Sequence, residues 1–258
     1  MIHADVDPWL VRTPSQEPAL LRLFCLPYSG GGASLFYGWQ EAFPPGVEVC
    51  AIELPGRASR FGEPLASQLS PLIAQMAEAL DPYFDLPFAI FGHCLGSLLG
   101  FELARYVRRQ YDIHPVHLFL SAHCAPQQMQ ANMSNGVPVH QLPDEAFIDE
   151  IRRLNGTPAS ILQDGALVRL LLPVLRADFT LSETYVYRED QPLPCAFSVF
   201  GGREDETLTP QDLAAWQEQT VGALSLCLFP GGHFFLHESQ GPLLDAIAQD
   251  LQQLLAGL

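Results

Sequence analysis

The stretch AIFGHCLGSLLGFELAR, residues 89–105, decides the fold, because an apolar run passes through two glycines directly into a helical pattern. Cys94 stands between Gly92 and Gly96, at the expected junction of a strand and a helix. Such a sharp turn exposes its central side chain, and it needs the two glycines because strand and helix pass too close for a Cβ atom. The helix N-terminus adds positive potential that stabilises a thiolate or an oxyanion. The stretch therefore predicts a nucleophile elbow with Cys94 as the nucleophile.

Apolar periodicity outside this stretch predicts strands that alternate with helices. The predicted strands cover residues 20–26, 47–52, 87–91, 117–122, 195–200 and 224–229. The predicted helices cover residues 69–83, 95–111, 143–154 and 243–255, and another begins at Thr209-Pro210. This alternation is typical of an α/β protein with a mostly parallel sheet covered by helices on both faces. In such sheets the chemistry gathers at the carboxyl ends of the strands.

The 258 residues suit a single domain, residues 1–258, with an insertion. Residues 1–19 are mixed in character and contain proline, which indicates an irregular lead-in. Between residues 124 and 190 no clear strand pattern occurs, and residues 143–154 and 165–187 have helical patterns, the second interrupted at Pro173. We interpret residues 124–190 as a helical insertion in the α/β domain.

A nucleophile needs a base, and His233 follows the last predicted strand in the loop FPGGHFF, residues 229–235. In folds with such an elbow the order along the chain is nucleophile, acid, histidine, and the position of His233 fits this order. The rival His237 lies just before the last helix, where a solvent-exposed or capping role fits better. His93 neighbours Cys94 but points away from it on the turn, so we expect it to pack.

The acid should follow the preceding strand, where the sequence reads FGGREDE, residues 200–206. We choose Asp205, whose short side chain at the loop apex can orient the histidine and stabilise the imidazolium. Glu204 and Glu206 fit a solvated turn better. The oxyanion hole needs two backbone N–H groups. We expect one from Leu95 and the other from the loop after the first of these strands, at Ser29 or Gly30.

Composition excludes several classes of function. The formal charge is −16, and all 13 basic residues are arginine, so nucleic-acid phosphates would be repelled and a lysine-dependent phosphate loop is excluded. No apolar run reaches the roughly 20 residues of a membrane span, and the N-terminus does not resemble a signal peptide, so we expect a cytosolic protein. The six cysteines form no CxxC pair, which disfavours a metal or disulfide framework. We expect four of them to be buried thiols, namely Cys25, Cys50, Cys195 and Cys227.

Several motifs together are similar to those of the type II thioesterases that accompany polyketide synthases and nonribosomal peptide synthetases, which are stand-alone α/β-hydrolases. The resemblance runs from about residue 21 to the last helix. It rests on LPYSGG (26–31), ELPGR (53–57), the elbow at Cys94, LPD (142–144), LPVLRAD (172–178), FGG (200–202) and GGHFF (231–235). This combination is far more specific than the elbow alone.

The resemblance implies that the protein hydrolyses stalled or aberrant acyl groups from the phosphopantetheine arm of acyl or peptidyl carrier proteins. It also implies that residues 124–190 form a lid over the acyl channel. Carried over to this sequence, the family's roles are Cys94 as nucleophile, His233 as base, Asp205 as acid, and the Ser29 and Leu95 amides as donors. We expect a monomer without cofactor or metal, in which apolar contacts dominate carrier docking because the chain itself is acidic.

Cys94 departs from the family, which usually has serine at the elbow. It allows three interpretations, namely a natural active thiol, a laboratory replacement of serine, or a site that favours acyl transfer. A different enzyme class, the dienelactone-hydrolase-like esterases, also uses cysteine in this elbow but needs no long lid. A non-catalytic protein that docks on a synthase is the other alternative, and the complete set of catalytic groups at strand ends argues against it.

Overall fold

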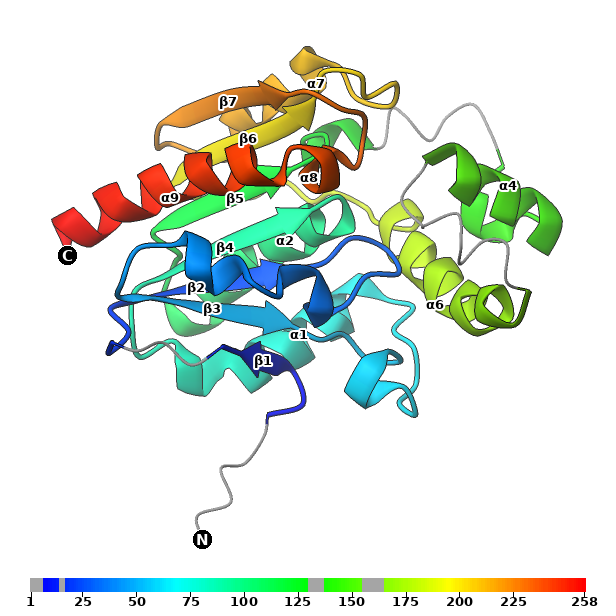
Figure 1. Ribbon diagram of the computed structural model, residues 1–258, viewed down its shortest axis with the longest axis horizontal. Coiled ribbons are helices and arrows are strands. Elements are labelled where there is room, and N and C mark those ends of the chain that lie inside the picture. Colours follow the sequence, from blue (N-terminus) through cyan, green and yellow to red (C-terminus); the bar gives the residue numbers. More distant parts are fainter. Residues whose placement is uncertain (1–6, 14–16, 130–136, 155–164) are drawn as a thin grey trace, which may run out of the picture.

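The computed structural model describes residues 7–13, 17–129, 137–154 and 165–258. In these residues seven strands form one sheet with the order β1-β3-β2-β4-β5-β6-β7, in which only β1 is antiparallel to its neighbour (Figure 1). The strands are β1 Leu10–Arg12, β2 Leu21–Leu26, β3 Val47–Ile52, β4 Phe88–His93, β5 His117–Ser121, β6 Ala196–Gly202 and β7 Leu224–Phe229. The prediction of an α/β fold with a mostly parallel sheet is confirmed.

Helices cover both faces of the sheet, as the alternating pattern predicts. The α-helices are α1 Leu69–Leu80, α2 Leu95–Tyr111, α4 Asp144–Leu154, α6 Gly165–Glu183, α7 Pro210–Ala214, α8 Phe235–Glu238 and α9 Gln240–Gly257. Short 3-10 helices occupy Ala33–Phe36, Trp39–Ala42, Ala58–Arg60, Asp81–Tyr83, Pro126–Gln128, Val139–Gln141 and Ala215–Gln219. Successive strand residues point to opposite faces, so Phe24 packs with the core of α1 and α2 while Cys25 packs with the core of α9.

The strand registers bring the functional loops to one edge of the sheet. Leu26 at the end of β2 pairs with Gly92 in β4, and His93 pairs with Ser121 at the end of β5. Gly202 at the end of β6 likewise pairs with Phe229 at the end of β7. Because these strands are parallel, the loops that follow them all emerge at their carboxyl ends.

The elbow has the strained backbone that the sequence predicts. Cys94 has φ 52° and ψ −119°, a conformation that L-residues rarely adopt. A Cβ atom on Gly92 would lie 2.1 Å from the carbonyl oxygen of Gly96, and one on Gly96 would lie 2.2 Å from that of Leu26. The buried Ser97 hydroxyl lies 2.8 Å from the carbonyl oxygens of Gly92 and Ser121. The turn is therefore held by backbone contacts that leave no room for larger residues.

The described α-helices between β5 and β6, α4 and α6, lie beside the sheet rather than against one of its faces (Figure 1). The described residues within 124–190 contain no strand, and Phe147, Ile151 and Leu175 form a small apolar core of their own. The parts at 130–136 and 155–164 lie outside the described residues. The predicted interruption at Pro173 is wrong, because α6 runs continuously from Gly165 to Glu183. Burial of the neighbouring Val174 and Leu175 holds the helix, although proline donates no hydrogen bond.

Three further expectations differ from the structure. The lead-in contains β1, whose three residues are too few to show a periodic pattern and which pairs with β3 at the sheet edge. Helix α9 begins at Gln240 rather than at residue 243. The N–H groups in the first turn of a helix have no intrahelical acceptors, so Pro242, which lacks an N–H, is accommodated there. Cys227 is exposed rather than buried, because β7 is an edge strand. No helix in the described part of the chain is long and apolar enough to cross a membrane.

We predict that Gly96→Ala destabilises the protein by about 3 kcal/mol or more, because the obstructing atom is a backbone oxygen that cannot rotate away. Urea unfolding followed by circular dichroism measures this difference. Gly62→Ala is the matched control, since a Cβ at Gly62 would meet nothing within 4 Å. Equal stability of the two variants would contradict the proposed close approach of strand and helix.

Candidate active site

The structure brings His233 and Asp205 together at the carboxyl ends of β6 and β7. His233 Nδ1 lies 2.8 Å from Asp205 Oδ2, and the Asp205 side chain is only 2% exposed. The two residues are 28 positions apart, and β6 and β7 pair directly. This contact leaves Nε2 of the imidazole as the nitrogen available for acid–base chemistry.

Thr207 is a residue of this site that the sequence analysis did not identify. Its backbone N–H donates to Asp205 Oδ1 at 2.8 Å, and its hydroxyl donates to the same oxygen at 2.6 Å. Burial raises the pKa of Asp205, but hydrogen bonds from His233 and Thr207 outweigh it and hold this pKa below its usual value. Asp205 is thus anionic and locked in orientation. A threonine two residues after an aspartate in a turn was the available signal.

The pKa of His233 is raised strongly. Burial lowers it, but the negative charges that Cys94 and Asp205 can carry outweigh burial and raise the pKa of His233 to about 10. The ring of His233 therefore favours the imidazolium form at neutral pH. Cys94, His233 and Asp205 are thus electrostatically coupled, since the charges of Cys94 and Asp205 both act on the pKa of His233.

Cys94 is half-buried and stands at the N-terminus of α2, and its backbone N–H donates to the Ser121 carbonyl at 2.8 Å. His93 beside it is fully buried, and its Nδ1 lies 2.9 Å from the Ser121 hydroxyl. Burial holds the pKa of His93 well below its usual value, so this ring is neutral. The expected packing role of His93 agrees with these contacts.

The two expected oxyanion donors are backbone N–H groups, one at Leu95 and one in the loop after β2. Leu95 is the first residue of α2, so its N–H has no intrahelical acceptor. Of the two candidates in the loop after β2, Gly30 donates its N–H to Asp178 Oδ2 at 2.7 Å. That contact removes the Gly30 amide from the oxyanion hole and leaves Ser29 as the candidate donor in this loop.

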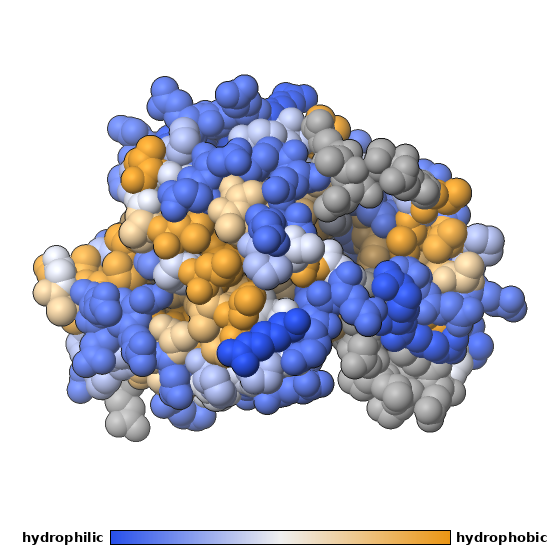
Figure 2. Space-filling view, turned by 90° about the horizontal axis from the view of Figure 1, so that it is seen from above, coloured by the Kyte–Doolittle hydropathy of each residue, from blue (hydrophilic) through white to orange (hydrophobic). Residues whose placement is uncertain are grey.

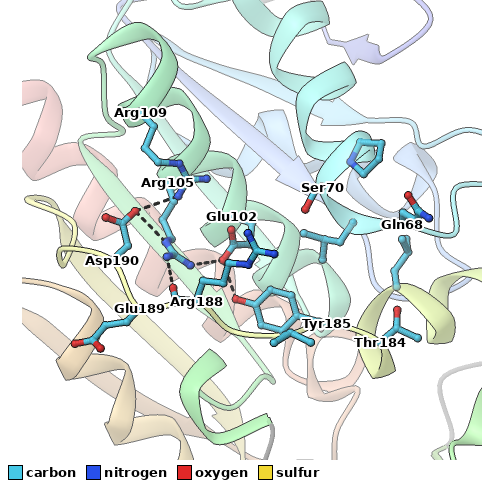
Figure 3. A pocket seen from close by; sticks show the side chains of 14 residues that line it. Gln68, Ser70, Glu102, Arg105, Arg109, Thr184, Tyr185, Arg188, Glu189 and Asp190 are labelled. Carbon is cyan, nitrogen blue, oxygen red and sulfur yellow. Dashed lines mark hydrogen bonds and ion pairs between the residues drawn. The ribbon is translucent and has the colours of Figure 1, made fainter.

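Two cavities show where a substrate can be accommodated. One of about 230 Å³ lies beside the His233–Asp205 pair and is also lined by Thr207, Phe234 and Arg153, so α4 of the insertion borders the site. A larger one of about 670 Å³ lies between α1, α2 and the chain after α6 (Figure 3). There Arg105 contacts Glu102 at 2.5 Å, and Tyr185 donates to Glu102 at 2.8 Å. Asp190 also pairs there with Arg105 and Arg109, and none of Cys94, His233 and Asp205 lines this cavity.

The described residues contain no cluster of three or more His, Cys, Asp or Glu side chains that could hold a metal ion. A thiol, an imidazole, a carboxylate and two free amides together suit acyl transfer from an activated carbonyl compound.

Comparison with known proteins agrees with this chemistry. The family model described as the thioesterase domain matches residues 21–255. The gramicidin S biosynthesis protein GrsT of Aneurinibacillus migulanus is 45% identical over 98% of this chain and 97% of its own length. Two solved structures are also similar over 93% of this chain. The type II thioesterase BorB from the borrelidin biosynthetic cluster has 35% identity, a TM-score of 0.83 and 96% of its chain covered. ClbQ from the colibactin NRPS/PKS pathway has 29% identity, a TM-score of 0.86 and 100% of its chain covered.

These matches confirm the predicted resemblance and the α/β-hydrolase fold. They do not favour a dienelactone-hydrolase-like esterase or a non-catalytic docking protein. The chain belongs to the thioesterase family and is a hydrolase that acts on thioesters.

Proposed function

We propose that this thioesterase is a type II editing enzyme, which hydrolyses stalled or aberrant acyl groups from the phosphopantetheine arm of carrier proteins. The observation that carries the proposal is the buried His233–Asp205 pair, at 2.8 Å, coupled to Cys94 at the elbow of a thioesterase-family chain. The similarity to GrsT from gramicidin S biosynthesis, BorB from the borrelidin cluster and ClbQ from the colibactin NRPS/PKS pathway supports this choice of substrate.

In the first step of the proposed mechanism, the Cys94 thiolate attacks the thioester carbonyl carbon. The tetrahedral intermediate collapses and expels the phosphopantetheine thiolate, which takes the proton held by the His233 imidazolium. The acyl group is now bound to Cys94 as a second thioester. Since one thioester replaces another, this step is nearly thermoneutral.

In the second step, neutral His233 takes a proton from water as the water attacks the acyl-enzyme. The new intermediate expels Cys94 as a thiolate and releases the carboxylic acid, which restores the starting ion pair. Asp205 keeps the imidazole oriented and stabilises its charged form in both steps. The N–H groups of Leu95 and Ser29 stabilise the oxyanion. The proposed cycle needs no cofactor.

The helical insertion suits a lid over this site. Arg153 of α4 lines the cavity beside His233, and α6 contacts the loop after β2. Figure 2 shows apolar side chains among polar ones at the right of the molecule, where α4 and α6 lie. We propose that residues 124–190 cover the acyl group, and that the enzyme acts as a cytoplasmic monomer. The free state of all six cysteines is consistent with a reducing compartment.

We predict that the unsubstituted protein removes the acyl group from an acylated carrier domain, as measured by intact-protein mass spectrometry. Cys94→Ser retains turnover, because the same base can activate serine. His233→Ala and Cys94→Ala lose at least ~1,000-fold of the rate, because each removes a member of the catalytic unit. Undiminished turnover by His233→Ala would refute the mechanism. If the unsubstituted protein keeps a stable acyl group on Cys94 while Cys94→Ser releases it, the cysteine retains the acyl group instead of hydrolysing it.

We predict that Asp205→Asn lowers the pKa of His233 from its value of about 10, because the variant loses the carboxylate charge that stabilises the imidazolium. Cys94→Ser also lowers it, by removal of the thiolate charge. NMR titration of the His233 ring measures both shifts. Glu206→Gln, in the same loop but outside the pair, is the control. An unchanged titration in Asp205→Asn would contradict the coupling.

The same pair predicts how stability depends on pH. The pKa of His233 in the folded protein is above its unfolded value, so its stabilising contribution is complete below about pH 6.5 and is lost as the pH rises through about 10. The difference in unfolding free energy between the unsubstituted protein and Asp205→Asn should therefore shrink between pH 7 and pH 11. Urea titrations across this interval measure it, and a difference that grows with pH would reverse the assigned sign.

We predict that salt does not weaken carrier binding. Carrier domains are usually acidic, so the net charge of −16 on this chain gives no attraction for salt to screen. Leu170 of α6 is 48% exposed, and Leu170→Glu should weaken binding by roughly 5-fold if about 1 kcal/mol of apolar burial is lost. Val221→Glu, at an exposed position before β7, is the control. Titration calorimetry at low and high salt decides, and a steep loss of affinity with salt would contradict apolar docking.

A further inference from the structure

The loop after β2 forms a tight turn over residues 28–31. The Gly31 N–H donates to the Tyr28 carbonyl at 2.9 Å, which closes the turn. Gly30 has φ +79°, as the third residue of a type II turn requires. Within this turn the amides of Gly30 and Gly31 both have acceptors in the protein, whereas the described residues offer none to the amide of Ser29. Of the two central residues of the turn, Ser29 and Gly30, only Ser29 thus has an N–H without an acceptor among the described residues.

Two charged residues far apart in sequence hold this turn. Asp178 of α6 accepts the Gly30 N–H at 2.7 Å, and Arg57 donates to the Gly31 carbonyl at 2.9 Å. Arg57 also donates from both terminal nitrogens to Asp178, each at 2.8 Å. The Ser29–Gly30 and Gly31–Gly32 peptide groups are therefore both tied to one bidentate ion pair.

The ion pair is buried, with Asp178 1% exposed and Arg57 8% exposed. Removing two charges from water is unfavourable unless their hydrogen-bonding groups are satisfied, so a buried pair is weak evidence of a stabilising role and stronger evidence of a geometric one. Both carboxylate oxygens of Asp178 have donors here, and one donor is the turn itself.

Helix α6 makes a second contact with the turn. A Cβ atom on Gly30 would lie 2.4 Å from Leu175 Cδ2, so the Leu175 side chain covers Gly30 directly. Leu175 and Asp178 are three residues apart and share one face of the helix. One face of α6 therefore holds the turn through both an apolar contact and a hydrogen-bonded charge.

We propose that Asp178 is a positioning residue for the oxyanion hole, which holds the turn so that the Ser29 N–H faces the reacting carbonyl oxygen. This inference rests on the proposed function, because it takes the Ser29 amide as an oxyanion donor. It adds that the position of α6 in the insertion and the geometry of the oxyanion hole are coupled through the Asp178–Arg57 pair. A displaced α6 would leave the nucleophile and base intact but misplace one donor.

The test uses Asp178→Asn in the full-length chain. Asparagine has the same shape, but its amide NH₂ faces a donor in place of one carboxylate oxygen, so the turn loses part of its anchor. We expect kcat for thioester hydrolysis to fall between about 10- and 100-fold with KM changed less than about 3-fold. That loss is smaller than the roughly 100- to 1,000-fold effect of removing an oxyanion donor, because the Ser29 amide is displaced rather than lost.

A second readout separates positioning from general damage. Alkylation of Cys94 by iodoacetamide, followed by peptide mass spectrometry, requires the Cys94–His233 pair but no oxyanion hole. Its rate should be unchanged in Asp178→Asn. Glu183→Gln is the matched control, since Glu183 is also a carboxylate of α6 that accepts backbone N–H groups, those of Val139 and His140, within the insertion. This variant should keep its kcat.

The outcomes are distinct. An unsubstituted protein that hydrolyses no thioester overturns the proposed function and this inference together. An active protein whose kcat is unchanged in Asp178→Asn overturns the inference alone, as does equal loss of alkylation and turnover, or an equal loss of kcat in Glu183→Gln. If Asp178→Asn does not fold, Arg57→Lys replaces it, because lysine keeps the charge but cannot reach Gly31 and both oxygens at once. The same loss of kcat with intact alkylation is expected.

Discussion

The close approach of the start of α2 to the end of β2 at the elbow is the constraint on which the rest of the structure depends. A Cβ on Gly96 would lie 2.2 Å from the Leu26 carbonyl oxygen, so the start of α2 lies directly against the end of β2. This contact sets the position of Cys94 relative to the loop after β2, which contains Ser29. The strained backbone of Cys94, with φ 52°, is held by the surrounding strands, and that strain directs the thiol into the site.

The charge distribution around the elbow suits a thiol nucleophile. Cys94 and Asp205 together raise the pKa of His233 to about 10, so the resting site holds a proton on the imidazole ready for the leaving group. With serine in the same place that thiolate charge is absent, and the imidazole must act first as a base. One frame can therefore serve either nucleophile, whereas the order of proton transfers differs between them.

Much of this arrangement could be predicted from local sequence, because elbow, base and acid each follow a strand and carry a recognisable turn. His233 and Asp205 contact each other as their places after β7 and β6 indicate. The features that sequence did not reveal depend on long-range pairing. The strand β1 exists because the edge of β3 accepts it, and Cys227 is exposed because nothing in the described chain pairs beyond β7. Thr207 had a local signal, an aspartate two residues earlier, but its role appears only once Asp205 is placed.

The choice between Ser29 and Gly30 as oxyanion donor shows why such contacts need a structure. The sequence places both amides in the same loop and leaves the choice open. The Gly30 N–H donates to Asp178, which leaves Ser29 as the candidate. Arg57 and Asp178 are 121 residues apart, on opposite sides of the elbow in the chain. Both lie in stretches, residues 53–57 and 172–178, that contributed to the predicted family resemblance without an evident chemical role. Their ion pair, which also contacts Gly30 and Gly31, gives both residues a role. An insertion that only covered the acyl group would need no buried charge directed at the loop after β2.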